Sequence, residues 1–173
     1  VEPDFVLMKF KKLAGGGYMK IANQSIGPAL EALGYESNEV NEIINYVIGS
    51  MSLEDSPYVN KKSLMEKGFN EEDVAKIEAA LPGAFEIQHA FNVFVLGEET
   101  LKGLGIEEEA YTSFDFNLLE TIGYSRNEIA QANLHICGTQ KIEGAPYLKD
   151  EHLDVFDCAN KCGKDGKRFI HYM

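Results

Sequence analysis

Apolar residues recur at helical spacing through much of this sequence. Val40, Ile43, Ile44 and Val47 stand three or four positions apart, which places them on one face of a helix. Gly49 follows them, and glycine closes a helix at low cost because it adopts positive φ readily. The pattern therefore predicts an amphipathic helix that ends at Gly49.

An internal repeat organises the pattern. Residues 30–64 align with residues 119–153 at an offset of 89 without a gap, and 11 of the 35 positions are identical. The identical pairs are Leu30/Leu119, Glu31/Glu120, Gly34/Gly123, Tyr35/Tyr124, Asn38/Asn127, Glu39/Glu128, Gly49/Gly138, Glu54/Glu143, Pro57/Pro146, Tyr58/Tyr147 and Leu64/Leu153. Chance would give about two identities with average residue usage. We interpret the segments as two copies of one unit.

Each copy carries the same local signals. A helix is expected to end at Gly34 or Gly123, and the tyrosine that follows packs back against it. Ser125 and Glu128 then have the spacing of a capping box, which starts a second helix. A proline after the next loop, Pro57 in the first copy, predicts a further short helix. The repeated unit is therefore helix, Gly-aromatic turn and capped helix.

The rest of the chain predicts helices with little strand. Pro82 and Gly83 break the chain, and the apolar residues 85–96 predict a helix up to Gly97. Short strands are expected at Asp4–Phe10 and Arg168–Tyr172, which pair with each other or with a sheet outside the chain. The predicted fold class is mainly α, an internally duplicated multi-helix bundle with short terminal strands.

Five segments describe the expected organisation. They are a basic connector with a strand and a Gly-rich turn (1–29), a first helical repeat unit (30–81), linking helices (82–118), a second helical repeat unit (119–153) and a Cys-containing basic tail (154–173). We therefore interpret the 173 residues as two related helical units with connectors, rather than as one self-contained globular domain.

Composition and charge add a further division. With 173 residues, 45% hydrophobic and 25% charged, the chain has the composition of a globular protein. Its net charge of −12 is uneven, since residues 1–20 carry +2 and residues 161–173 carry +3, which leaves −17 between them. The basic ends are interpreted as docking surfaces, with chance clustering at solvated termini as the alternative. The acidic balance argues against a broad nucleic-acid-binding surface.

The sequence also indicates the cellular compartment of the protein. No apolar run approaches the roughly 20 residues of a membrane span, and no signal peptide precedes the first motif. The three cysteines are an odd number, which argues against a disulfide framework and favours a reducing compartment. We therefore expect a cytoplasmic protein that does not contact a membrane.

A Gly-rich turn is the first candidate binding site. Gly15, Gly16 and Gly17 follow a predicted strand, and their backbone N–H groups, together with Lys20, could hold the phosphate of a cofactor. The turn lacks the lysine-Ser/Thr pair of a Walker motif and the glycine spacing of a dinucleotide fold. A flexible connector is the alternative interpretation.

The cysteines are the second candidate. Cys158 and Cys162 have a spacing found among zinc ligands, and Cys137 is the third candidate ligand. A redox pair and plain packing are the alternatives. Cys137 stands where the first copy has Ile48, which favours a small buried hydrophobe at that position.

Other polar features have structural explanations. The acidic runs at residues 71–73, 98–99 and 107–109 each stand at a predicted helix start, where negative charge meets the positive end of the helix dipole. His89 lies in the apolar segment and is expected to be a core histidine rather than a catalyst. Helix-hairpin-helix modules, which bind nucleic-acid backbones, also use glycine turns, but acidic residues beside these turns would repel phosphate.

Three long segments resemble one enzyme family. DFVLMKFKKLAGGGYMKIANQS (4–25), IEAALPGAFEIQHAFN (77–92) and ICGTQKIEGAPYLKDEHLDVFDCANKCGKDGKRF (136–169) are similar to an internal stretch of the adenosylcobalamin-dependent (class II) ribonucleotide reductases. The resemblance covers nearly the whole chain. Tyr147 and Lys161 depart from it, since the family pattern has His and Pro there.

The resemblance implies a parent enzyme that reduces ribonucleotides to deoxyribonucleotides. Such an enzyme forms a thiyl radical by homolysis of the cobalt–carbon bond, and a cysteine pair supplies electrons. The family motifs for the radical cysteine, that pair and the substrate phosphate match no position here, so no catalytic residue is assigned.

The implied role of the chain is that of a helical accessory region. Its partner would be the remainder of the catalytic barrel, with nucleotide bound by the parent enzyme. The isolated segment would bind no adenosylcobalamin and have no reductase activity, although zinc is a candidate metal. The alternatives are a helix-hairpin-helix binding module and a small zinc-stabilised interaction domain.

Overall fold

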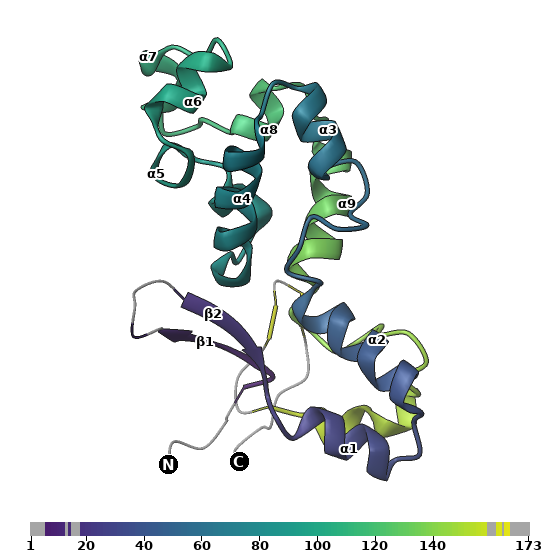
Figure 1. Cartoon of the computed structure of the whole chain (residues 1–173). Coiled ribbons are helices and arrows are strands. Elements are labelled where there is room, and N and C mark those ends of the chain that lie inside the picture. The colour runs from purple at the N-terminus through teal and green to yellow at the C-terminus, as the bar shows by residue number, and fades with distance from the viewer. Residues whose placement is uncertain (1–5, 13, 15–17, 159–161, 164, 167–173) are drawn as a thin grey trace. The chain divides into compact units, whose positions relative to one another are not determined.

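The computed structural model describes residues 6–12, 14, 18–158, 162–163 and 165–166. It is mainly helical with one small sheet, as predicted (Figure 1). The chain forms two compact units, which we call unit 1 (Val1–Gly49 and Gly138–Met173) and unit 2 (Ser50–Cys137). Each unit has its own hydrophobic cluster. No helix in the described ranges has both the length and the apolar character to cross a membrane.

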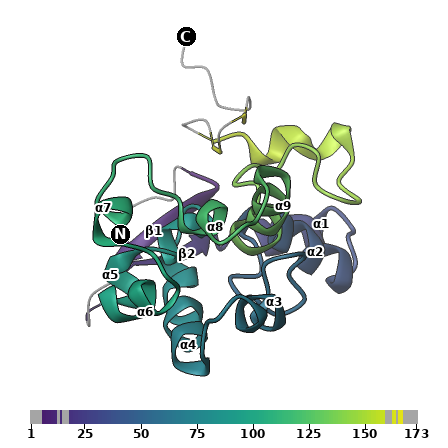
Figure 2. The ribbon, with the colours of Figure 1, turned by 90° about the horizontal axis from the view of Figure 1, so that it is seen from above.

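The sheet is an antiparallel hairpin in unit 1. Strand β1 (Met8–Lys12) pairs with β2 (Tyr18–Ala22), and the two lie side by side in Figures 1 and 2. The first predicted strand overlaps β1, but its partner is β2, which lies within the expected basic connector (1–29). Tyr18, Met19 and Ile21 suit a strand, so a hairpin forms locally without a distant segment. The second predicted strand, Arg168–Tyr172, lies outside the described residues.

The helices of unit 1 come from both ends of the described chain. They are α1 (Ile26–Ala32), α2 (Ser37–Ile48) and the 3-10 helix η3 (Asp150–Phe156). Val40, Ile43 and Val47 of α2 are buried, as their spacing predicted. Gly34 has φ +91° between α1 and α2, a conformation that confirms the predicted glycine turn.

Unit 2 consists of short helices. In chain order they are α3 (Lys61–Glu66), α4 (Glu71–Ala80), η1 (Leu81–Gly83), η2 (Ile87–Ala90), α5 (Val93–Leu96), α6 (Glu98–Gly103), α7 (Glu108–Tyr111), α8 (Leu118–Thr121) and α9 (Arg126–Cys137). Gly123, with φ +94°, separates α8 from α9 as predicted. The short helix expected after Pro57 is α3, and it begins only at Lys61, because the side chain of Asn60 caps it.

The predicted helix over residues 85–96 is wrong. The segment forms η2 and α5, with a break at Phe91–Asn92. The side-chain oxygen of Asn92 accepts hydrogen bonds from the backbone N–H groups of Phe94 and Val95, so Asn92 starts a new helix. A cap inside an apolar run therefore outweighs its helical periodicity.

The compact units divide the chain differently from the five expected segments. Unit 1 contains residues 30–49 of the first repeat copy and residues 138–153 of the second. Unit 2 contains residues 119–137 of the second copy and residues 50–64 of the first. Each unit is thus built from the first half of one copy and the second half of the other.

Equivalent residues of the two copies make equivalent backbone hydrogen bonds inside each unit. In both units the two residues that follow one copy's glycine donate backbone hydrogen bonds to carbonyl groups in the last turn of the other copy's helix. Those carbonyl groups would otherwise lack partners. In unit 1 the bonds are Thr139 N to Tyr46 O and Gln140 N to Val47 O, both 2.8 Å; in unit 2 they are Ser50 N to His135 O and Met51 N to Ile136 O, both 2.9 Å.

The tyrosine after each glycine turn also has an equivalent partner. In unit 1 the Tyr35 hydroxyl lies 2.7 Å from Nδ1 of His152 and accepts a hydrogen bond from the Lys149 N–H at 2.9 Å. In unit 2 the Tyr124 hydroxyl lies 2.7 Å from Oγ of Ser63. Residues 152 and 63 differ by 89, the repeat offset. The predicted packing of these tyrosines therefore takes the same form in both units.

The capping box at the start of α9 is present as predicted and gives a pH-dependent prediction. Glu128 accepts hydrogen bonds from the N–H and the hydroxyl of Ser125, both 2.7 Å, and these bonds lower the pKa of Glu128 below 4.5. Because the folded-state pKa is lowered, this stabilisation is present above pH 4.5 and is lost as the pH falls through the folded pKa. Glu128→Gln should therefore destabilise α9 at pH 7 and much less at pH 3.

Urea unfolding at both pH values would measure this difference. Glu109→Gln, at an exposed position on α7, is the control and should show a smaller pH-dependent difference. A Glu128→Gln effect that is the same at pH 3 and pH 7 would contradict the ionised capping box.

Candidate functional site

The Gly-rich candidate is only partly described. Gly15, Gly16 and Gly17 lie outside the described residues. Lys20, on β2, is 2% exposed, and its ammonium group donates a hydrogen bond of 2.9 Å to the carbonyl of Ile48. That carbonyl belongs to the last turn of α2, where the helix dipole favours positive charge. Lys20 therefore stabilises a helix end and does not extend toward solvent to meet a phosphate.

The three cysteines have different surroundings. Cys137 is fully buried at the end of α9, as its place in the repeat suggested. Cys158 and Cys162 are half-buried in unit 1, and their side chains are hydrogen-bonded to each other. Within the described part of the chain, no group of three or more His, Cys, Asp or Glu side chains could hold a metal ion. The structure therefore brings two of the three predicted ligands together, with no further ligand beside them among the described residues.

The Cys158–Cys162 pair is electrostatically asymmetric. The backbone N–H of Leu7 donates to Sγ of Cys162 at 3.4 Å. The hydrogen bond from Cys158, together with that from Leu7, lowers the pKa of Cys162 to about 6. The same Cys158–Cys162 bond, with burial, raises the pKa of Cys158. These hydrogen bonds therefore favour the thiolate form of Cys162 over that of Cys158.

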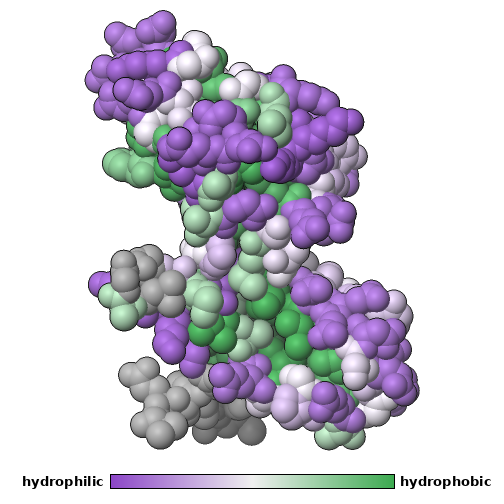
Figure 3. Space-filling view, viewed as in Figure 1, coloured by the Kyte–Doolittle hydropathy of each residue, from purple (hydrophilic) through white to green (hydrophobic). Residues whose placement is uncertain are grey.

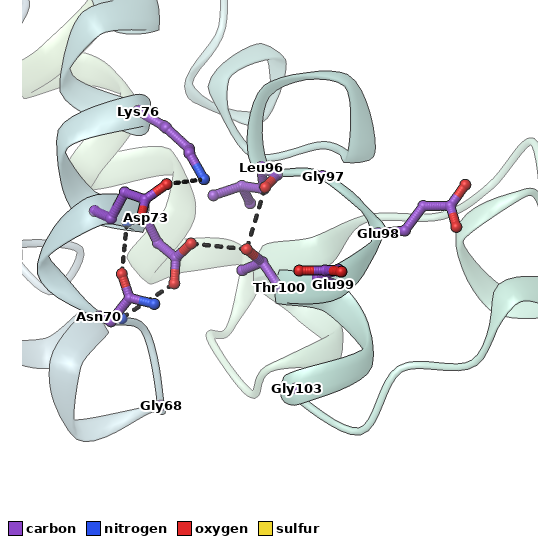
Figure 4. Close-up of a pocket in the computed structure, with 11 residues that line it drawn as sticks. Gly68, Asn70, Asp73, Lys76, Leu96, Gly97, Glu98, Glu99, Thr100 and Gly103 are labelled. Atoms are coloured by element: carbon purple, nitrogen blue, oxygen red, sulfur yellow. Dashed lines mark hydrogen bonds and ion pairs between the residues drawn. The ribbon is translucent and has the colours of Figure 1, made fainter.

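An acidic pocket of about 460 Å³ lies between α4 and α6 in unit 2. Figure 4 shows Asp73 and Thr100 pointing toward each other, and the Thr100 hydroxyl donates to Asp73 at 2.7 Å. Asp73 is 3% exposed and also accepts from the N–H of Asn70. Lys76 pairs with Glu72 at 2.8 Å. These groups cap α4 and join it to α6, so the pocket has a structural explanation.

The acidic runs lie at helix starts, as predicted. Residues 71–73 form the first turn of α4, residues 98–99 that of α6, and residues 107–109 the start of α7. Hydrophilic side chains cover the region of α6 and α7 in the space-filling view (Figure 3). These carboxylates therefore stabilise short helices.

His89 is not the core histidine that the sequence predicted. It is exposed, because η2 is a single 3-10 turn that presents Ile87 and Ala90 to the core instead. Its Nδ1 accepts a hydrogen bond of 3.3 Å from the N–H of Glu86. His89 thereby lines a second pocket, which the sequence analysis missed.

This second pocket, which we call the Phe94–Phe114 depression, has a volume of about 800 Å³ in unit 2. Phe94 is 96% exposed and Phe114 is 102% exposed, as in an extended chain. Arg126 and Glu120 also line the depression and pair at 3.4 Å. Exposed aromatic rings gathered in one depression are typical of interaction surfaces, since water solvates them poorly.

Tyr147 is one of the two positions that depart from the family pattern. It has φ +62° and is 52% exposed. Its hydroxyl is hydrogen-bonded to Glu42, and this carboxylate raises the pKa of Tyr147. The other departure, Lys161, lies outside the described residues.

Comparison with known proteins gives the following relationships. No protein-family model matches the chain. The chain is 52% identical over 171 residues, 98% of its length, to a protein of Bradyrhizobium diazoefficiens named vitamin B12-dependent ribonucleotide reductase. A protein of the same name from Agrobacterium fabrum is 47% identical over 171 residues, and one from Rhodopirellula baltica is 41% identical over 64 residues. The chain spans only 14% and 13% of the length of the first two relatives.

Proposed function

Because the chain belongs to the vitamin B12-dependent ribonucleotide reductase family, we propose that it is a helical accessory region of such an enzyme. The single observation that carries this proposal is the 52% identity to one relative over 98% of the chain. The family resemblance predicted from the sequence is thereby confirmed. The helix-hairpin-helix and zinc-domain alternatives receive no support from the relatives' names.

The parent enzyme is inferred to reduce ribonucleotides to deoxyribonucleotides with adenosylcobalamin, which would supply the radical chemistry. The described residue suggested for a cofactor does not fit this group, since Lys20 is buried and bonded to Ile48. Neither the acidic pocket nor the buried Cys137 adds a catalytic constellation. We therefore assign cofactor and nucleotide to the rest of the enzyme, and a non-catalytic role to this chain.

The Phe94–Phe114 depression is the proposed docking surface in unit 2. Its occupant is an apolar part of the remaining reductase polypeptide, because the relatives extend over about seven times the length of this chain. Covering a fully exposed phenylalanine contributes about 1.5–3 kcal/mol. Both phenylalanines line the same depression, so burying them against the rest of the enzyme would stabilise the assembled protein.

The β1 strand offers a second kind of surface in unit 1. Lys9, Lys11 and Lys12 are exposed on it and account for most of the positive charge near the N-terminus. Lysines on a strand edge also discourage uncontrolled strand pairing. These side chains support the interpretation that the basic end faces an acidic part of the parent enzyme.

Substitution of the two phenylalanines tests the docking proposal. The test uses a chimera in which this chain replaces the aligned segment of the Bradyrhizobium diazoefficiens reductase. Phe94→Ala/Phe114→Ala should lower the reductase activity of the chimera at least about fivefold and lower its Tm. The isolated chain with the same changes should unfold within about 0.5 kcal/mol of the unaltered chain, because both rings are already exposed there.

Leu134→Ala is the matched control, since Leu134 is 55% exposed in the same unit and does not line the depression. It should leave the activity and Tm of the chimera nearly unchanged. Equal effects of the control and the double variant, or no effect of either, would refute docking at the Phe94–Phe114 depression.

We also propose that residues 30–64 and 119–153 arose by duplication of one unit. The 11 identities are supported by the equivalent hydrogen bonds at an offset of 89. Equivalent backbone conformations add to this, since Tyr58 and Tyr147 have φ +61° and +62°, and Met51 and Gln140 have φ +56° and +61°. Each unit would then combine the first half of one copy with the second half of the other, an arrangement that we call the exchange of halves. The chain passes from one unit to the other twice, after Gly49 and after Cys137.

A further inference from the structure

Cys158 and Cys162 are the chemically most distinctive side chains outside the proposed docking surface. They are separated by three residues, pack beside the hydrophobic cluster of unit 1 and are not joined by a disulfide. Their side chains are hydrogen-bonded to each other. Two sulfurs in contact can form a disulfide with little movement of the backbone, provided the bond geometry can be reached.

The surroundings of the two sulfurs differ. Sγ of Cys162 accepts a hydrogen bond from the N–H of Leu7, whereas the Cys158 thiol lies 3.4 Å from the carbonyl of Phe156. A backbone donor stabilises a thiolate, and a backbone carbonyl stabilises a thiol that donates to it. Half-burial leaves both sulfurs accessible to a small reagent, in contrast to the fully buried Cys137.

We propose that Cys158 and Cys162 form a reversible dithiol–disulfide site that exchanges with a low-molecular-weight disulfide. This inference goes beyond the proposed function and does not depend on it. Cys162 is the attacking residue and Cys158 the resolving residue, since the Leu7 N–H donates to Sγ of Cys162 at 3.4 Å, whereas the Cys158 thiol donates to the carbonyl of Phe156.

The exchange proceeds in two steps. The Cys162 thiolate attacks one sulfur of the external disulfide, forms a mixed disulfide and releases one thiolate. Cys158 then loses its proton to solvent and attacks Sγ of Cys162, which releases the second thiolate. The two cysteines lose two electrons and two protons, and the external disulfide gains them as two thiols.

The site is coupled to the start of the hairpin. In the reduced state, the charge on Cys162 attracts the N–H of Leu7, which is itself 3% exposed. Disulfide formation removes this negative charge, so the Leu7 amide loses a charge-assisted hydrogen bond. Oxidation should therefore accelerate hydrogen exchange at the Leu7 amide.

The lowered pKa of Cys162, about 6, agrees with this assignment. Alkylation of Cys162 by iodoacetamide should reach half its maximal rate near pH 6, whereas an unperturbed thiol does so near about pH 8.5. Cys137 should react only when the chain unfolds, because it is fully buried.

A redox titration of the full chain tests the proposal. The chain is equilibrated in glutathione/glutathione-disulfide buffers of increasing oxidised fraction, and peptide mass spectrometry identifies the products. The expected product is a Cys158–Cys162 disulfide, two hydrogens lighter than the dithiol and reversible by dithiothreitol. Cys158→Ser should instead accumulate a glutathione adduct on Cys162, and Cys162→Ser should reduce adduct formation at least about tenfold.

Cys137→Ser is the control and should not change the titration of the other two cysteines. The proposal is overturned if the dithiol persists in fully oxidised buffer, if alkylation of Cys162 follows a midpoint near pH 8.5, or if stoichiometric zinc protects both thiols. Should a serine variant fail to fold, the titration of the unaltered chain and its Leu7 hydrogen exchange still decide between these outcomes.

Discussion

Gly138→Ala should destabilise unit 1 by about 2–5 kcal/mol. Gly138 has φ +73°, and a left-handed conformation costs a residue with a Cβ about 1–2 kcal/mol. An alanine Cβ at this position would also overlap backbone atoms of Val47, Ile48 and Gly49, which form the end of α2. Backbone cannot rotate away as a side chain can, so overpacking adds about 1–3 kcal/mol.

Gly34→Ala separates these two causes. Gly34 also has positive φ, +91°, but a Cβ there would meet no atom within 4 Å. Gly34→Ala should therefore lower the free energy of unfolding only by the cost of the left-handed backbone conformation, about 1–2 kcal/mol. Hydrogen-exchange mass spectrometry, read separately on peptides of unit 1 and unit 2, would measure both variants. Equal destabilisation by the two substitutions would show that the backbone at Gly138 is not closely packed.

Leu30→Ala and Leu119→Ala should each cost about 3–5 kcal/mol, in different units. Both side chains are 0% exposed, Leu30 in the cluster of unit 1 and Leu119 in that of unit 2. Each substitution removes buried methyl groups and leaves a cavity that the surrounding short helices can close only in part. Because the two leucines occupy equivalent repeat positions, the two costs should be similar.

The location of the effect is as informative as its size. Leu30→Ala should accelerate hydrogen exchange mainly in unit 1, which includes residues 138–153 of the second copy. Leu119→Ala should act mainly in unit 2, which includes residues 50–64 of the first copy. Denaturant titration gives the free energies, and Leu134→Ala on the surface is the control for both. Acceleration confined to residues 30–64 in the first variant would contradict the exchange of halves.

Local signals in the sequence predicted the helices of the repeat. The spacing of Val40, Ile43 and Val47 and the glycines at positions 34 and 123 act over a few residues, so they can be read without the fold. The capping box of Ser125 and Glu128 was predictable for the same reason. The family could be recognised because three long segments resemble the same enzyme.

Features that depend on distant residues could not be predicted. Nothing within residues 30–64 shows that their second half packs with the other copy, because the partner lies about 89 positions away. The exposure of Phe94 and Phe114 depends on which apolar side chains are buried in the core. In the structure, Ile87, Ala90 and Leu96 are among the buried ones. The cap at Asn92 was a local signal that a sustained apolar run obscured.

The reductase activity of a chimera decides whether this chain is a helical region of a B12-dependent ribonucleotide reductase. The chimera with the Bradyrhizobium diazoefficiens enzyme is assayed for adenosylcobalamin-dependent reduction of a ribonucleotide, beside a variant in which a flexible Gly/Ser linker replaces the same segment. We expect the chimera to have activity within about tenfold of the unaltered relative, and the linker variant to lose activity. A folded but inactive chimera, or a linker variant with full activity, would contradict this expectation.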